Sequence, residues 1–160
     1  MSTAEDIIKL RQLVADHRIA MVSTSAPTGE LHSRPVKTQE IDDAGSFWFI
    51  VSSKADWVAG LSADEPVNLG YTDSDDKTWV SVAGTARLTE DAARVARYRD
   101  GGGNDGHRID DADIRLLVVA PSTVEYWDAP SGKLEALAVK AAKAIGKGSA
   151  KDSSGTISLG

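Results

Sequence analysis

One short segment of the sequence places an arginine beside a proline among residues that favour a β-strand. The segment is His32-Ser33-Arg34-Pro35-Val36, and proline has no backbone N–H to donate to a neighbouring strand. Such a strand lies at a sheet edge, contains a bulge or forms the wall of a ligand site. The planar guanidinium is a fork of donors that matches the pyrimidine oxygens and phosphate of a flavin. It matches the carboxylate of an acidic neighbour equally well, so the residues alone leave both interpretations open.

Tryptophans are the second feature that could contribute to a binding site. The chain has four in 160 residues, which exceeds what a small core usually needs. Flat indoles suit a planar ligand, but they also serve cores and protein interfaces. The four are Trp48, Trp57, Trp79 and Trp127.

Familiar catalytic motifs are absent from the sequence. It has no glycine-rich phosphate loop, no Gly-x-Ser-x-Gly elbow and no His-Glu-x-x-His helix. It also has no cysteine, which excludes disulfides, thiolate nucleophiles and cysteine-ligated metals, so any redox chemistry needs a cofactor. We expect surface positions rather than a metal site for the histidines, which are His17, His32 and His107.

The charge of the chain argues against nucleic acid as a partner. Its formal net charge of −6 repels a phosphate backbone. We interpret the one basic patch, at helical spacing near the C-terminus, as a solvated face formed by Lys140, Lys143, Lys147 and Lys151. No apolar run is long enough for a membrane span and the first residues do not resemble a signal peptide, so we expect a cytoplasmic protein without membrane contact.

Short β-rich runs separated by turns dominate the chain. Strands are expected at 19–25, 31–42, 47–52, 66–72, 78–89, 115–120 and 123–127, with a glycine-rich loop at 100–111. Helices are expected at 3–17, 54–63, 90–99 and 134–145, the first beginning with a capping box of Thr3 and Asp6. The hairpin turns are too short for parallel crossovers, which predicts a mostly β fold, an antiparallel barrel with helical covers.

Five segments in order resemble one known group of proteins. They are LHSRPVKTQE, FWFIVS followed by a helix, PVNLGYTD, WVSVAGTARL and VEYWDAPSGK, and the resemblance covers residues 14–146. Together they are similar to the general stress proteins among the pyridoxamine phosphate oxidase-like, FMN-binding split barrels. The resemblance implies a six-stranded split-barrel domain at 1–146, with helices at both ends, followed by a flexible tail at 147–160.

The resemblance also implies a homodimer with two FMN sites between its protomers. The arginine strand would flank the flavin with Ser33, Arg34, Pro35 and Val36. The end of the next strand and the start of the following helix would hold the phosphate with Val51, Ser52, Ser53, Lys54 and Trp57. The partner protomer would contribute Trp79, Ser81 and Trp127.

The phosphate-holding segment departs from the pattern of the group. A hydroxyl residue, a serine and a lysine are common where this chain has Val51, Ala55 and Trp57. Losing several charge-assisted hydrogen bonds of about 1.5–3 kcal/mol each would weaken binding by orders of magnitude. Ser52, Ser53 and Lys54 are the candidates to compensate, at a helix start whose N–H groups favour an anion.

Three functions are compatible with these residues. The first is an FMN-dependent oxidoreductase, with FAD as a further possible cofactor and a nicotinamide or another small redox molecule as substrate. The second is a non-catalytic stress protein that binds or buffers flavin. The third is a split barrel that binds haem or a deazaflavin, or that has lost its ligand.

Overall fold

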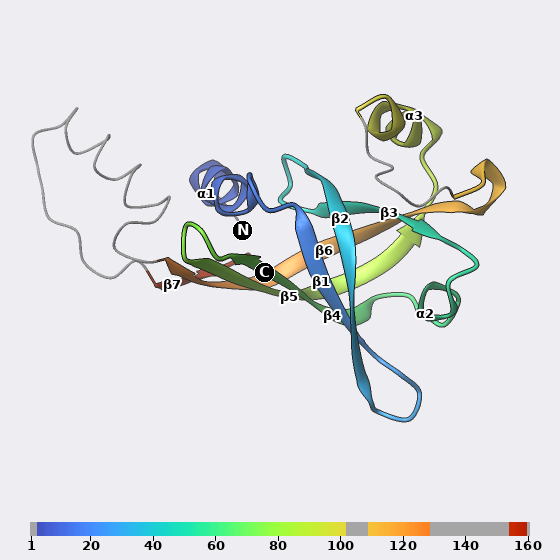
Figure 1. Ribbon diagram of the computed structural model, residues 1–160, viewed down its shortest axis with the longest axis horizontal. Coiled ribbons are helices and arrows are strands. Elements are labelled where there is room, and N and C mark those ends of the chain that lie inside the picture. Colours follow the sequence, from blue (N-terminus) through green and yellow to red (C-terminus); the bar gives the residue numbers. More distant parts are fainter. Residues whose placement is uncertain (1–2, 102–108, 129–153, 160) are drawn as a thin grey trace, which may run out of the picture.

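The computed structural model describes residues 3–101, 109–128 and 154–159. Six antiparallel strands close a barrel in the order β3-β2-β1-β4-β5-β6, because β6 also pairs with β3 (Figure 1). The predicted six-stranded antiparallel barrel is therefore confirmed. The strands are β1 (Ile19–Ser25), β2 (Leu31–Ile41), β3 (Phe47–Ser52), β4 (Glu65–Asp73), β5 (Thr78–Thr89) and β6 (Ile114–Asp128).

The turns between the first strands follow from their glycines. Gly29 ends the turn between β1 and β2 with φ +86°, and Gly45 lies between β2 and β3 with φ +85°. Both values lie in the left-handed region that glycine adopts without a steric penalty. The β1–β2 hairpin extends away from the barrel in Figure 1.

The last barrel strand is longer than the sequence indicates. The runs predicted at 115–120 and 123–127 form the single strand β6, which pairs with β5 along its length. The register shifts at Ala83 and Gly84, opposite Pro121. A side chain at position 84 would collide with the carbonyl oxygen of Ala120, so this close approach requires glycine.

The C-terminal tail contains a strand that the sequence analysis misses. A flexible tail is predicted at 147–160, but Gly155–Ser158 forms β7 against β6. Ile157 pairs with Val124 and is buried in the core, which explains why this segment is fixed in place. The helix predicted at 134–145 and most of the glycine-rich loop lie outside the described residues.

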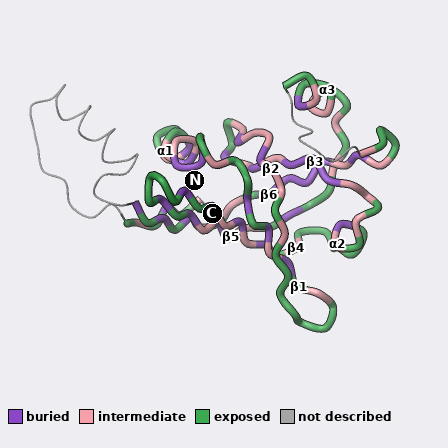
Figure 2. Tube along the Cα trace, viewed as in Figure 1, coloured by how far each residue is buried: buried purple, intermediate pink, exposed green. Residues whose placement is uncertain are grey.

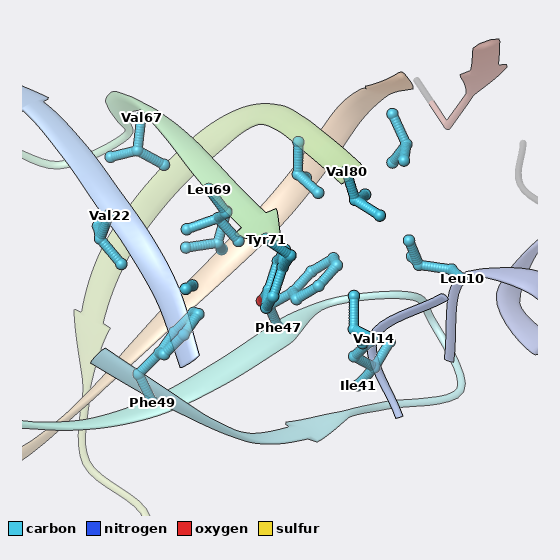
Figure 3. Packing of buried hydrophobic residues seen from close by; sticks show 14 of the residues in the cluster. Leu10, Val14, Val22, Ile41, Phe47, Phe49, Val67, Leu69, Tyr71 and Val80 are labelled. Atoms are coloured by element: carbon cyan, nitrogen blue, oxygen red, sulfur yellow. The ribbon is translucent and has the colours of Figure 1, made fainter. Parts of the chain in front are cut away.

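The core fills the barrel with alternating side chains of its strands. Figure 2 shows buried and exposed residues alternating along the strands, and Val80 and Val82 point inward as predicted. Phe47, Phe49 and Leu69 are fully buried at its centre (Figure 3). The hydroxyls of Tyr71 and Thr38 are hydrogen-bonded at 2.7 Å inside this core, where burial raises the pKa of Tyr71.

Two of the predicted helices have the expected positions. Helix α1 (Ala4–Val14) begins with the predicted capping box and buries Leu10 and Val14 against the barrel. Helix α3 (Ala92–Asp100) begins at the N-cap Asp91. None of the helices among the described residues has the length and hydropathy needed to cross a bilayer.

The helix predicted at 54–63 is much shorter than expected. Only Asp56–Ala59 forms α2, a single turn whose N-cap, Ala55, makes no side-chain cap bond. Gly60 follows directly, and glycine is a poor helix former. A helix of a single turn has only a weak macrodipole. Its N-terminus is therefore not expected to attract an anion, in contrast to the prediction from the sequence.

Candidate functional site

Arg34 lies where the barrel is open along β2. This strand pairs with β3 only at Thr38–Ile41, so among the described strands its first half has β1 as its sole neighbour. Pro35 lies in that half, which agrees with the predicted edge strand. The sequence places Arg34 one residue earlier, on the opposite side of β2 from Pro35.

The Arg34 guanidinium is held from two sides. Its Nη1 donates to the hydroxyl of buried Thr24 at 2.8 Å and weakly to the carbonyl of Val22 at 3.4 Å. Its central carbon lies 4.6 Å from the centre of the Trp57 ring on α2, a cation–π contact. Burial lowers the pKa of Arg34, although a guanidinium remains protonated in proteins. Sequence reasoning paired neither Arg34 with Trp57 nor Arg34 with Thr24.

The turn after β3 brings together three of the predicted phosphate-holding residues. The Ser52 hydroxyl accepts from the Lys54 backbone N–H at 3.2 Å, and the Ser53 N–H donates to the Asp113 carbonyl at 2.8 Å. The Lys54 ammonium forms an ion pair with the Asp113 carboxylate at 2.7 Å. This hydrogen bond, with the charge of Asp113, raises the pKa of Lys54.

Two residues of the predicted site pack into the barrel. Val51 is only 4% exposed in the core, so its side chain offers nothing to a ligand at the surface. Val36 is half-buried and packs against the same core. Either residue could contact a ligand at the edge of β2 or β3 chiefly through its backbone.

The remaining predicted residues share one outer surface of the sheet, which we term the outer sheet face. One row of paired residues crosses it from Pro35 through Met21 and Gly70 to Ser81. Trp79 and Trp127 lie opposite each other on β5 and β6, 43% and 47% exposed. Alternation places Ser33 on this face with Pro35.

The outer sheet face is rich in exposed apolar side chains. Ile19 and Met21 on β1 are 52% and 44% exposed and accompany the two tryptophans. Its polar residues are already paired, because the Asn68 amide donates to the Ser81 hydroxyl at 2.9 Å and the hydroxyls of Ser23 and Ser33 are 2.6 Å apart. Exposed apolar patches of this kind mark interaction surfaces.

Sequence reasoning overlooks a polar cleft beside β2. It has a volume of about 340 Å³ and lies between β2 and the end of α3. The signal in the sequence is a run of four polar residues, 37–40, within a predicted strand. The cleft is lined by Arg18, Lys37, Gln39, Glu40, Arg97, Tyr98 and Gly101.

The histidines do not converge with these residues. His17 contacts the buried carboxylate of Asp73 at 2.9 Å, and His32 lies 3.6 Å from Glu30 at the hairpin. His107 lies outside the described residues.

Barrel topology and sequence together define the class of protein. The chain matches the family described as Pyridoxamine 5'-phosphate oxidase like over residues 5–152 and belongs to it. The family expected from the five segments is thereby confirmed. No curated protein is significantly similar to the chain.

Several solved structures share the fold. A putative general stress protein 26 from Jannaschia sp. CCS1 has a TM-score of 0.67 at 20% identity, covering 98% of this chain and 99% of the other. The general stress FMN/FAD binding protein of Xanthomonas citri has a TM-score of 0.62 at 23% identity, covering 79% and 90%. A heme binding protein from Mycobacterium smegmatis has a TM-score of 0.57 at 18% identity, covering 79% and 54%.

Proposed function

We propose that the protein binds a flavin nucleotide, FMN, between two copies of the chain. The observation that carries the proposal is the division of the predicted site into two surfaces. Arg34 and Trp57 meet at the open edge of β2, whereas Trp79, Ser81 and Trp127 lie on the outer sheet face. A flavin in contact with both groups would be placed between one protomer and its partner.

The chemistry of the open edge fits the ring system of a flavin. Of the three guanidinium nitrogens of Arg34, Nη1 is the one that donates to the described residues. Nε and Nη2 are therefore available to acceptors such as flavin carbonyl oxygens. The Trp57 indole holds the guanidinium in place, which reduces the entropy lost on binding. The FMN/FAD binding described for the Xanthomonas citri protein supports flavin as the ligand.

The outer sheet face fits a second copy of the chain. Ile19, Met21, Trp79 and Trp127 expose apolar side chains on this face that a partner would remove from water. Aromatic residues and methionine are enriched at protein interfaces. A homodimer would therefore bury this face and complete the flavin site at the same time.

We infer that the bound flavin makes the protein an oxidoreductase. The flavin, when bound, supplies the hydride and electron transfer, and the residues of the chain bind and orient it. This role requires no protein nucleophile, in agreement with a chain that has no cysteine. Reduction of the bound flavin by NADH or NADPH, followed by reoxidation, distinguishes an enzyme from a protein that only stores flavin.

The first experiment is to identify what the purified protein binds. We expect mass spectrometry of the co-purified small molecule to find FMN, and light scattering to give the mass of a dimer. The apo-protein is then titrated with FMN, FAD, a deazaflavin and haem. A colourless protein that takes up haem but no flavin would overturn the proposal, and so would a monomer that binds flavin fully.

A substitution at Arg34 tests the site itself. Arg34→Ala removes the donors at the open edge, and we expect FMN affinity to fall by about tenfold or more, as for loss of a charge-assisted hydrogen bond. Arg87→Ala is the matched control, because Arg87 is an exposed arginine on β5 and the charge change is the same. Equal losses in both variants would contradict a specific role for Arg34.

A further inference from the structure

The corner formed by the β3–α2 turn and Arg34 has nearly balanced charges, and we term it the β3–α2 corner. Lys54 contributes a positive charge, but its ammonium is paired with Asp113 at 2.7 Å and also lies in the field of the Asp110 carboxylate. Asp56 adds another negative charge two residues after Lys54. Arg34 supplies the second positive charge and is stacked on Trp57.

These contacts do not fit a site that binds a phosphate dianion strongly. To reach a phosphate, Lys54 would have to leave Asp113, so one ionic contact would replace another with little net gain. The carboxylates of Asp110 and Asp113 would also repel the incoming dianion. Val51 adds no donor, because its apolar side chain is buried in the core, and the uncharged indole of Trp57 adds no positive charge.

We propose that the Lys54–Asp113 ion pair makes this protein nearly indifferent to the 5′-phosphate of a flavin, so that it binds riboflavin almost as well as FMN. The inference rests on the proposed flavin-binding function and specifies its ligand. Ring contacts at the open edge, those of Arg34 included, provide most of the affinity, and the phosphate gains at most one charge-assisted contact. This inference is opposite to the sequence-based expectation that Lys54 compensates for the missing phosphate-holding groups.

The direct test compares two ligands that differ only in the phosphate. Riboflavin and FMN are titrated against the apo-protein, and binding is followed by quenching of flavin fluorescence. We expect their dissociation constants to lie within about tenfold of each other, because a single charge-assisted contact separates them.

A charge variant tests the ion pair itself. Asp113→Asn releases the Lys54 ammonium, and we expect FMN to bind about tenfold more tightly while the riboflavin affinity changes by less than about twofold. The matched control is Asp111→Asn, because Asp111 pairs with Arg99 and the variant makes the same change in net charge nearby. Neither affinity should change in the control.

A second variant covers the case in which Asp113→Asn fails to fold. Lys54 is 72% exposed, so Lys54→Ala should fold, and we expect it to leave both affinities within about twofold of the parent protein.

The outcomes separate this inference from the proposed function. If FMN binds about a hundredfold more tightly than riboflavin, flavin binding stands and the inference is wrong. An equal gain in Asp111→Asn, no gain in a folded Asp113→Asn, or a large loss of FMN affinity in Lys54→Ala would also overturn it. If neither flavin binds, the proposed function fails and the inference fails with it.

Discussion

Two arginines of this protein stack on tryptophans, and their surroundings differ. The Arg94 guanidinium lies 3.9 Å from the ring centre of Trp48, and the Arg34 guanidinium lies 4.6 Å from that of Trp57. Arg94 donates to the Glu40 carboxylate at 2.7 Å, whereas Arg34, within residues 3–101, 109–128 and 154–159, donates only to a hydroxyl and a carbonyl.

The polar groups of the Arg94–Trp48 pair are hydrogen-bonded to carboxylates of the chain. Glu40 also accepts from Arg97 and from the buried Tyr98, and the indole N–H of Trp48 donates to Asp42 at 2.8 Å. These contacts attach α3 to β2 and β3. Among the described residues, the Arg34 pair has a cation without a carboxylate partner, so its remaining donors are available to an acceptor on a ligand. The difference assigns Arg94 to the architecture and Arg34 to the candidate site.

The largest loss of stability should follow from removing Glu40, the carboxylate that accepts from Arg94, Arg97 and Tyr98. Glu40→Ala removes the nearer of two carboxylates that pair with Arg94, the other being Asp91 at 3.3 Å, and leaves the buried Tyr98 hydroxyl with one partner fewer. We expect the free energy of unfolding to fall by about 2 kcal/mol, as for the loss of charge-assisted hydrogen bonds in a half-buried site. Urea denaturation followed by circular dichroism measures it.

Arg34→Ala is the comparison for that experiment. Because Arg34 has no carboxylate partner in the part of the chain that the structure describes, we expect this variant to lose less than about 1 kcal/mol of stability. If it is destabilised as strongly as Glu40→Ala, Arg34 is a structural residue like Arg94 and the distinction between the pairs is wrong.

A smaller effect separates the two tryptophans. Trp48→Phe removes the indole N–H that donates to Asp42, and we expect a loss of about 1 kcal/mol in unfolding free energy. Trp57→Phe breaks no hydrogen bond within the described residues and should cost about 0.5 kcal/mol or less, from the weaker cation–π contact. Both losses of unfolding free energy are measured from denaturation midpoints. A larger loss in Trp57→Phe than in Trp48→Phe would contradict the distinction between the two pairs.

Much of the fold follows from local patterns in the sequence. The apolar run 47–52 and the alternating run 78–89 became β3 and β5 with the predicted bounds, because each pattern extends over a whole strand. Strand β7 has a glycine- and serine-rich surrounding that resembles a linker, and it depends on pairing with the distant β6. Long-range pairing of this kind leaves no local signal.

The candidate site was predictable only in part, for a related reason. Arg34 was visible because a proline beside an arginine is unusual in a strand. The Lys54–Asp113 pair joins residues that are far apart in sequence, and nothing near Lys54 indicates that its charge is already neutralised. The contact of Arg34 with Trp57 likewise depends on the position of α2, whose length the sequence analysis overestimates.

The smallest expected effect is a change in how stability depends on alkaline pH. Burial, followed by the hydrogen bond to Glu40, raises the pKa of Tyr98 above its ordinary value near 10. Above about pH 10 the unfolded chain therefore loses this proton while the folded protein retains it, so stability must fall as pH rises. Tyr71 contributes in the same direction, because burial raises its pKa as well.

Tyr98→Phe should make that fall less steep, whereas Arg34→Ala should leave it unchanged, because a guanidinium does not titrate in this range. Denaturation curves between about pH 9 and 11 measure the slope. Tyr98→Phe also lowers stability at neutral pH, because it loses the contact with Glu40. The change of stability with pH, and not its absolute value, is therefore the quantity to compare. An unchanged slope in Tyr98→Phe would show that the pKa of Tyr98 is not raised in the folded protein, contrary to a buried hydroxyl that is hydrogen-bonded to Glu40.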